Sequence, residues 1–300
     1  MNVIRTPADM QRWALAERAA GCRLGCVPTM GCLHDGHLSL VRRARAGADR
    51  VVLTIFVNPV QFGPHEDFAR YPRTEEADLE RCRAAGVDVV FLPAAADMYA
   101  ADQSVYVIEE RLGRGLCGAA RPGHFRGVCT VVAKLFNLAL PHVAVFGQKD
   151  FQQAAILRRM VRDLNFPVEV IVAPIVREAD GLAMSSRNRN LSPAERRQGL
   201  GLNRVLRFAQ DAWAGGETDA AALCGRLRET LATGHGLRVD YVEAVDGDTL
   251  EPVAVLRAGA VVAVAAFAGS TRLIDNTVLG DSSHGLPAMA GPGCKQVRPC

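Results

Sequence analysis

Two histidines three residues apart, His34 and His37, are the residues of this chain best suited to chemistry on a phosphate. An apolar run over 24–27 precedes them and apolar residues recur at helical spacing over 38–44, which predicts a strand, a glycine-bearing turn and a helix. Backbone N–H groups at a helix start attract anions, and imidazoles donate hydrogen bonds to charged oxygens. The segment therefore suits a nucleotide whose α-phosphate is attacked, although two surface histidines at a helix cap would show the same pattern.

Amide side chains follow a second predicted strand, over 51–57. Asn58 and Gln61 come directly after it, among apolar neighbours. They are therefore expected at the carboxyl end of a strand, where open α/β sheets bind ligands. This mixture suits a small, branched, hydroxylated acid. The alternative is a polar turn made rigid by Pro59.

Two later segments offer groups that hold phosphate and ribose. Lys149 and Asp150 follow the predicted strand 143–146; the lysine can meet a phosphate as a point charge, and the aspartate can accept from ribose hydroxyls. The two serines of 185–186 and the forked, always charged Arg187 form a second phosphate grip. Taken alone, the first pair could be a solvated ion pair and the second group a helix-capping loop.

Up to about residue 172, short apolar runs alternate with amphipathic stretches. The clearest predicted strands span 51–57, 87–92, 143–146 and 168–172, and the predicted helices begin near 74 or span 128–138 and 151–164. This repeat predicts an α/β fold with a Rossmann-like, doubly wound, mostly parallel sheet.

The character of the chain changes after Pro174. Two long predicted helices, over 193–213 and 219–233, are followed by strands over 238–245 and 260–267, which predicts a smaller α+β C-terminal domain. The expected division is residues 1–174, residues 175–280 and a flexible Gly-, Pro- and Ser-rich tail over 281–300.

Composition limits the class of protein. A formal net charge of +3 is too small to indicate a nucleic-acid or membrane partner. The nine cysteines are scattered, with no CxxC pair, and indicate reduced thiols. The N-terminal residues lack the apolar core of a signal peptide, and no apolar run is long enough to span a bilayer, so we expect a cytoplasmic protein.

Five motifs occur together in one order and spacing: PTMGCLHDGHLSLV, FVNPVQFG followed by YPRT, GHFRGV, FGQKDFQQ and READGLAMSSRNRNLS. In this combination the chain resembles the bacterial pantothenate synthetase family, the pantoate–β-alanine ligases, over about residues 1–280. It is also similar to nucleotidyltransferases and class I aminoacyl-tRNA synthetases in its HxGH and Met-Ser-Ser-Arg segments. The resemblance implies a reaction in which pantoate attacks the α-phosphorus of ATP, giving pantoyl adenylate and pyrophosphate, and β-alanine then displaces AMP.

The resemblance also implies roles for particular residues. The implied catalytic residues are His37 as the acid, His34, Lys149, Ser185, Ser186 and Arg187. The implied ATP contacts are Met30, Gly31, Cys32, Leu33, His34, Asp35, Gly36, His37, Gly147, Gln148, Lys149, Asp150, Val176, Met184, Ser185, Ser186 and Arg187. The implied contacts to pantoate or β-alanine are Pro28, Met30, Asn58, Gln61 and Gln153.

Further expectations from the resemblance concern metal, assembly and motion. Mg²⁺ would be held mainly by the ATP phosphates, with Asp78 as a possible protein ligand; Ala77 interrupts the acidic cluster that relatives offer to the metal. The family implies a homodimer formed through the N-terminal domain. The C-terminal domain, which carries Ser185 to Arg187, is expected to act as a lid over ATP.

Two other functions fit the HxGH segment and the basic serine loop alone. One is a nucleotidyltransferase that transfers AMP or CMP to a phosphorylated acceptor. The other is a non-catalytic nucleotide- or RNA-binding module. The small net charge argues against RNA, and the joint presence of all the polar residues argues against an inactive relative.

Overall fold

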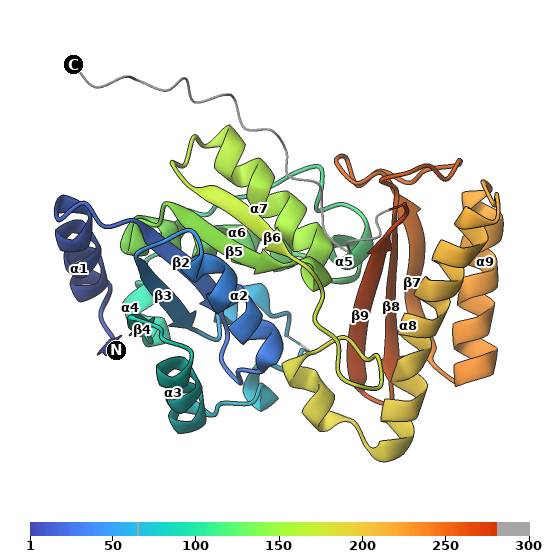
Figure 1. The fold of residues 1–300 in the computed structure, drawn as a ribbon, viewed down its shortest axis with the longest axis horizontal. Helices are drawn as coiled ribbons and strands as arrows, with labels where there is room; N and C mark the ends of the chain where they lie inside the picture. Colours follow the sequence, from blue (N-terminus) through green and yellow to red (C-terminus); the bar gives the residue numbers. More distant parts are fainter. Residues whose placement is uncertain (65, 281–300) are drawn as a thin grey trace.

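The computed structural model describes residues 1–64 and 66–280 (Figure 1). Its N-terminal part is built around a six-stranded parallel sheet in the order β1-β4-β3-β2-β5-β6. The strands are β1 (Asn2–Ile4), β2 (Leu24–Thr29), β3 (Arg50–Ile55), β4 (Val89–Phe91), β5 (Val143–Gly147) and β6 (Glu169–Ala173). The predicted doubly wound α/β fold is confirmed, and β1 is a strand that the sequence analysis missed.

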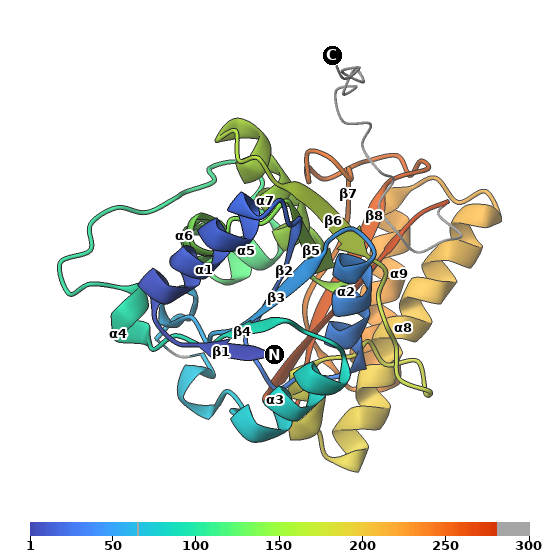
Figure 2. The same cartoon turned by 60° about the vertical axis from the view of Figure 1, so that its left-hand side comes forward.

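Helices cover both faces of this sheet (Figures 1 and 2). One face carries α1 (Pro7–Ala19), α6 (His124–Ala139) and α7 (Phe151–Asp163), and the other carries α2 (Asp35–Arg45) and α3 (Glu75–Ala84), while α4 (Ala95–Met98) and α5 (Leu116–Ala120) are short. Because side chains alternate along a strand, Val52 packs in the core under α1, α6 and α7, and Val51 and Leu53 pack in the core under α2 and α3. Strands buried on both faces explain the continuous apolar runs of the sequence.

The C-terminal part pairs two helices with a small antiparallel sheet, as expected of an α+β unit. It comprises α8 (Pro193–Ala214), α9 (Ala220–Glu229), β7 (Arg238–Val245), β8 (Val261–Ala268) and β9 (Thr271–Val278), with strand order β7-β8-β9. Strand β9 was not predicted. The helix predicted over 219–233 is observed as α9 followed directly by a π-helical turn, Thr230–Gly234. The division at residue 174 stays a prediction, and the expected tail over 281–300 lies outside the described residues.

The antiparallel sheet is shared between two cores. Along β8, Val262 and Val264 pack against α8 and α9, whereas Val261 and Ala263 join the apolar cluster that contains α6 and α7. The C-terminal sheet is therefore packed on both faces, and one face closes against the N-terminal part. Among the described residues, no helix is long and apolar enough to cross a membrane.

The parallel sheet opens between its two central strands. Strand β2 pairs with β3 along its whole length but with β5 only through Gly25 and Cys26. Beyond Cys26 the two strands separate, and Pro28, which has no N–H to donate, faces this gap. Strands β3 and β4 lie on one side of β2, and the later strands β5 and β6 lie on the other, so the strand order reverses at this gap. Such a switch point is where sheets of this class bind ligands.

Candidate active site

The loop after β2 is held by a buried carboxylate. Gly31 and Cys32 both have positive φ (80° and 50°), and helix α2 begins at Asp35. Both oxygens of Asp78, which is 2% exposed, accept backbone hydrogen bonds from this loop, one from Cys32 N–H at 2.8 Å and the other from Leu33 N–H at 2.7 Å. Asp78 therefore fixes the path of the chain into the histidine segment, and both of its oxygens are already used.

The two histidines lie against each other at the start of α2. Their ring centroids are 4.0 Å apart, and His34 N–H donates to Nδ1 of His37 at 3.3 Å. A neutral imidazole has one N–H, so acceptance at Nδ1 places the proton of His37 on Nε2, from which it can be donated to a ligand. Within the described part of the chain, Nδ1 of His34 is buried without a hydrogen-bond partner.

Both histidines are uncharged at neutral pH. Burial, with the nearby Lys149 as a second cause, lowers the pKa of His34 to about 4. Burial, followed by His34 and Lys149, lowers the pKa of His37 to about 3. The pair therefore offers hydrogen-bond donors, and the positive charge beside it belongs to Lys149.

Lys149 is held in place by the C-terminal sheet. It lies in the short 3-10 turn Gln148–Asp150 after β5, with Nζ 3.6 Å from a carboxylate oxygen of Asp150. The side-chain amide of Asn276 on β9 donates to the carbonyls of Gln148 at 2.9 Å and Lys149 at 3.0 Å. The Gln148 side chain is buried toward Asn276, away from the cavity described below. An inward-facing Asn on a strand is not a signal that a sequence motif reveals, and Asn276 was missed.

Asn58 positions Gln61 in the turn after β3. The Asn58 amide donates to Gln61 Oε1 at 3.0 Å and to the Gly127 carbonyl at 3.1 Å, and its Oδ1 accepts from the Tyr99 hydroxyl at 2.7 Å. These contacts use the polar atoms of Asn58 within the protein. A Cβ on Gly127 would lie 2.6 Å from the Gln61 backbone, so only glycine lets α6 approach this turn so closely.

The serine–arginine loop crosses from the C-terminal part to the histidine loop. Ser186 Oγ donates to the Cys32 carbonyl at 3.0 Å, and Ser185 Oγ accepts from Arg187 N–H at 3.3 Å at the start of the 3-10 turn Ser186–Asn190. The Arg187 guanidinium donates from Nε and Nη2 to the two oxygens of Asp67, at 2.8 Å each. Asp67 belongs to none of the motifs recognised in the sequence.

These segments converge on a cavity of about 210 Å³ at the gap between β2 and β5. The expected site residues that line it are Pro28, Met30, His34, Gly36, His37, Asn58, Gln61, Gly147, Lys149, Asp150, Gln153, Val176, Met184, Ser185, Ser186 and Arg187. The expected residues that do not line it are Gly31, Cys32, Leu33, Asp35, Gln148 and the possible metal ligand Asp78. Tyr71, which also lines it, carries no motif signal apart from its place in YPRT.

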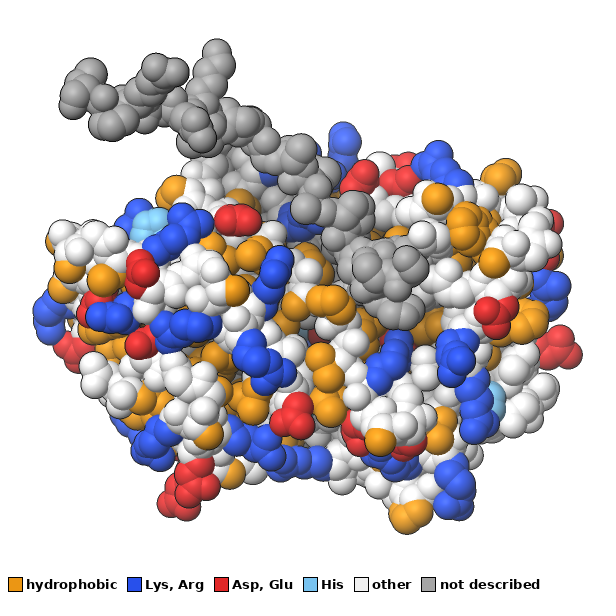
Figure 3. All heavy atoms as spheres, viewed as in Figure 1, with side chains coloured by type: hydrophobic (Ala, Val, Ile, Leu, Met, Phe, Trp, Pro, Cys, Tyr) orange, Lys and Arg blue, Asp and Glu red, His pale blue; other side chains and the backbone are white. Residues whose placement is uncertain are grey.

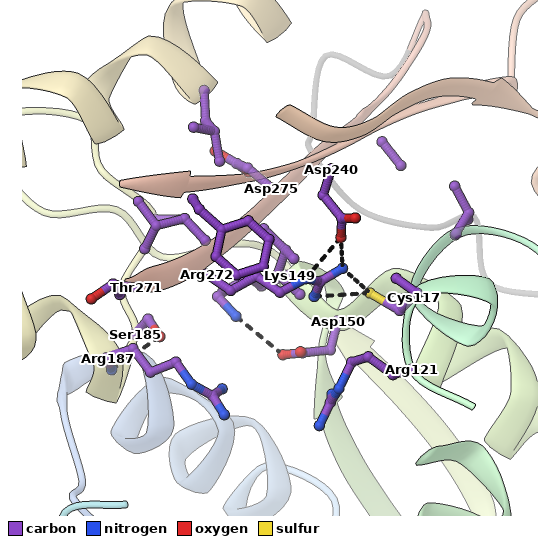
Figure 4. A pocket seen from close by; sticks show the side chains of 18 of the residues that line it. Cys117, Arg121, Lys149, Asp150, Ser185, Arg187, Asp240, Thr271, Arg272 and Asp275 are labelled. Atoms are coloured by element: carbon purple, nitrogen blue, oxygen red, sulfur yellow. Dashed lines mark hydrogen bonds and ion pairs between the residues drawn. The ribbon is translucent and has the colours of Figure 1, made fainter. Parts of the chain in front are cut away.

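A larger cavity of about 550 Å³ adjoins the first and lies between the two parts of the chain. It shares Lys149, Asp150 and Arg187 with the smaller cavity and adds Arg121 and Arg272 (Figure 4). The segment 118–127, which overlaps the GHFRGV motif, is partly helical and contributes Arg121 to this wall. Over the face in Figure 3, basic side chains lie scattered among acidic and apolar ones, unlike the basic stripe of an RNA-binding surface.

A doubly wound α/β sheet with HxGH at one central strand end, and a lysine and a serine–arginine loop around the same cavity, defines a nucleotide-handling enzyme of the HxGH class. The family model of pantoate-beta-alanine ligase matches residues 2–278. The chain therefore belongs to the pantoate-beta-alanine ligase family, whose reaction is the ATP-dependent formation of pantothenate from pantoate and β-alanine. This confirms the resemblance and decides against the two alternative functions.

Relatives and solved structures agree with this assignment. The chain is 54% identical over 280 residues to the pantothenate synthetase of Thermotoga petrophila, covering 93% of this chain and 100% of the relative. It is 57% identical over 259 residues to that of Acidobacterium capsulatum, covering 86% and 87%. A pantothenate synthetase structure from Thermus thermophilus superposes with a TM-score of 0.87 at 45% identity, covering 93% and 99%. The Francisella tularensis pantoate-beta-alanine ligase, solved in complex with beta-gamma ATP and beta-alanine, superposes with a TM-score of 0.77 at 29% identity, covering 93% and 97%.

The role of Asp78 can be measured by its amide variant. In Asp78→Asn, one oxygen is replaced by an N–H donor, so one buried backbone N–H of the loop loses its acceptor. We expect the free energy of unfolding to fall by about 2 kcal/mol. Urea denaturation measures this, with the exposed neighbour Glu76→Gln as the matched control. A loss in Asp78→Asn no larger than in the control would contradict the role.

The buried histidines should make stability depend on pH. In the unfolded chain His37 takes up a proton near its ordinary pKa of 6.5, whereas in the folded chain it does so only near pH 3. Between these pH values the unfolded chain binds the extra proton, so the free energy of unfolding decreases as the pH falls from 6.5 toward 3. Between pH 7.5 and pH 5, wild type should lose about 2 kcal/mol more stability than His37→Gln. Urea denaturation at both pH values tests this, and equal losses in the two proteins would show that burial does not hold His37 neutral.

Proposed function

We propose that the cavity at the β2–β5 gap carries out both steps of the family reaction through a pantoyl adenylate. In the first step, a pantoate carboxylate oxygen attacks the α-phosphorus of ATP and pyrophosphate leaves. In the second, the β-alanine amine attacks the acyl carbon and AMP leaves. The observation that carries the proposal is that two neutral histidines, Lys149 and the Ser185–Arg187 loop line one cavity at the switch point of the sheet.

Charge neutralisation is the main requirement of the first step. A carboxylate approaching a triphosphate meets like-charge repulsion, and the oxygens around phosphorus gain charge as it reacts. His37, a neutral ring with its proton on Nε2, donates a hydrogen bond to these oxygens, whereas the resemblance implied an acid, and His34 lies beside it. Lys149 supplies a fixed positive charge, and Ser185, Ser186 and Arg187 hold the β- and γ-phosphates.

The substrates are held by groups whose positions the fold determines. Gln61, oriented by Asn58, and Gln153 hydrogen-bond pantoate, with Pro28 and Met30 as apolar wall; Gln61 also lies close to β-alanine. Gly147, Asp150 and Val176 take the adenosine. The Val176 carbonyl already accepts the Met184 N–H at 2.9 Å, so the backbone N–H of Val176 is the group offered to the base.

Magnesium is proposed to be held by the ATP phosphates. Across residues 1–64 and 66–280, no group of three or more His, Cys, Asp or Glu side chains could hold a metal ion. Asp78, the carboxylate expected from the resemblance, is 2% exposed, lines neither cavity and accepts one backbone N–H on each oxygen. When bound, Mg²⁺ would neutralise phosphate charge, and the protein side chains would position the phosphates around it.

The reaction assay should show AMP and pantothenate formed from ATP, Mg²⁺, pantoate and β-alanine, with no turnover without Mg²⁺. Without β-alanine, pantoate-dependent exchange of labelled pyrophosphate into ATP reports the adenylate. In His37→Ala the exchange rate should fall about 100-fold, the cost of one lost oxyanion donor. His235→Ala, outside both cavities, is the matched control. Pantothenate formation without exchange, or with release of ADP, would contradict the adenylate route.

A homodimer in the cytoplasm completes the proposal. Several large apolar side chains of the N-terminal part are exposed, among them Leu15 on α1 and, in the segment after α4, Val105 and Ile108. Light scattering should give about twice the chain mass of 32.2 kDa. Ile108→Asp should shift the protein toward monomer, whereas Val255→Asp, on the C-terminal part, should not. A monomeric wild type at micromolar concentration would contradict the dimer.

A further inference from the structure

The arginine proposed to hold ATP phosphates is already paired with an anion of the chain itself. Arg187 donates from Nε and Nη2 to the two carboxylate oxygens of Asp67, both at 2.8 Å. Each side chain is about a quarter exposed, and the guanidinium also lies over the Tyr71 ring, 5.6 Å from its centroid. This is a two-pronged, partly buried pair, which is the strong form of an Arg–carboxylate contact.

The edge of Arg187 that Asp67 occupies, formed by Nε and Nη2, is one of the two edges through which a guanidinium holds an anion with paired N–H groups. Guanidinium binds carboxylate and phosphate alike through two parallel N–H groups, because both anions present two oxygens at matching spacing. A triphosphate that binds this edge competes with Asp67 for the same two donors. An exchange of one anion for the other keeps the guanidinium paired, so its charge is not left buried and uncompensated at any stage.

Asp67 is charged when the exchange occurs. Burial on its own raises the pKa of Asp67, but the hydrogen bonds and charge of Arg187 outweigh it and leave this pKa below its ordinary value. The neighbouring residue has a parallel contact: the Glu66 carboxylate pairs with Arg121 at 2.6 and 2.7 Å. Figure 4 shows the guanidinium groups of Arg121 and Arg187 projecting into the same space from different elements.

We propose that Asp67 is an internal competitor for Arg187, which the β- and γ-phosphates of ATP displace and which recaptures the arginine when pyrophosphate leaves. This rests on the proposed phosphate-binding role of Arg187. Asp67 then sets the affinity for every ligand that carries a diphosphate or triphosphate, and it has no effect on a monophosphate. It is a residue that tunes affinity and product release rather than one that touches the reacting atoms.

Equilibrium binding of three probes tests the proposal: a β,γ-nonhydrolysable ATP analogue, pyrophosphate and AMP, each measured by calorimetry with Mg²⁺. In Asp67→Asn, we expect the analogue and pyrophosphate to bind at least about fivefold more tightly, since an amide is a weaker partner for guanidinium. AMP affinity should stay the same. Asp67→Glu, which restores a carboxylate, should move both affinities back toward those of wild type.

A double-variant comparison separates competition from a general charge effect. In an Arg187→Gln background, Asp67→Asn should change the affinity of the ATP analogue less than about twofold, because the contested guanidinium is gone. Asp240→Asn removes the same charge from the adjoining cavity, where Asp240 pairs with Arg272 at 2.7 Å, and is the matched control. Equal tightening in the Arg187→Gln background or in the control would overturn the proposal.

Two further outcomes are decisive. Weaker binding of the ATP analogue in Asp67→Asn, with an unchanged unfolding temperature, would mean that Asp67 orients Arg187 or helps to hold the metal, and the proposal would fall. If Arg187→Gln alone leaves the affinity of the analogue unchanged, Arg187 holds no phosphate and the inference falls with that assignment. The pyrophosphate exchange assay on wild type still judges the adenylate route independently.

Discussion

The pairing between β2 and β5 ends after Gly25 and Cys26, and the site depends on that early separation. If the hydrogen-bonded pairing of β2 with β5 continued past Cys26, β5 would fill the space beside Pro28. Because it ends, the loops after β2 and β5 point into one opening, which brings the histidine pair and Lys149 together from residues more than a hundred positions apart. Proline at residue 28 is compatible with this arrangement since no ladder partner there requires its missing N–H.

The loops and side chains of the site are positioned by other polar residues, which need no contact with a ligand. Asp78 takes the two loop N–H groups before α2, Asn276 holds the backbone at Lys149, and Asn58 orients Gln61. Asp78 and Asn276 are distant in the sequence from the residues they support, and Asn276 lies on the C-terminal sheet. The C-terminal part therefore contributes to the site twice, through the serine–arginine loop and through the support of Lys149, so the packing between the two parts is a requirement of the chemistry.

Much of this arrangement could be predicted from the sequence, and the reasons for the misses are physical. Long periodic helices such as α7 and α8 and buried runs such as β3 carry strong patterns, and most residues that the motifs singled out line one cavity. Strand β1 is only three residues long, too short for a pattern. Asp67 and Asn276 act through contacts across more than a hundred residues, and no local spacing encodes which distant group a carboxylate or an amide will meet.

The neutrality of the histidines follows from the same packing and bears on how the site treats charge. An imidazolium beside Lys149 would place two positive charges in a buried space, which burial and the lysine both disfavour. Neutral rings can still donate one N–H each, so in the proposed binding mode they would offer phosphate oxygens directional hydrogen bonds, while Lys149 and Arg187 would supply positive charge. With Asp150 beside Lys149 and Asp67 on Arg187, each cation has an internal anion before ATP arrives. If ATP binds as proposed, the tetra-anionic nucleotide would exchange partners at charges that are already neutralised. This would cost less desolvation than creating new buried pairs and would let pyrophosphate leave again.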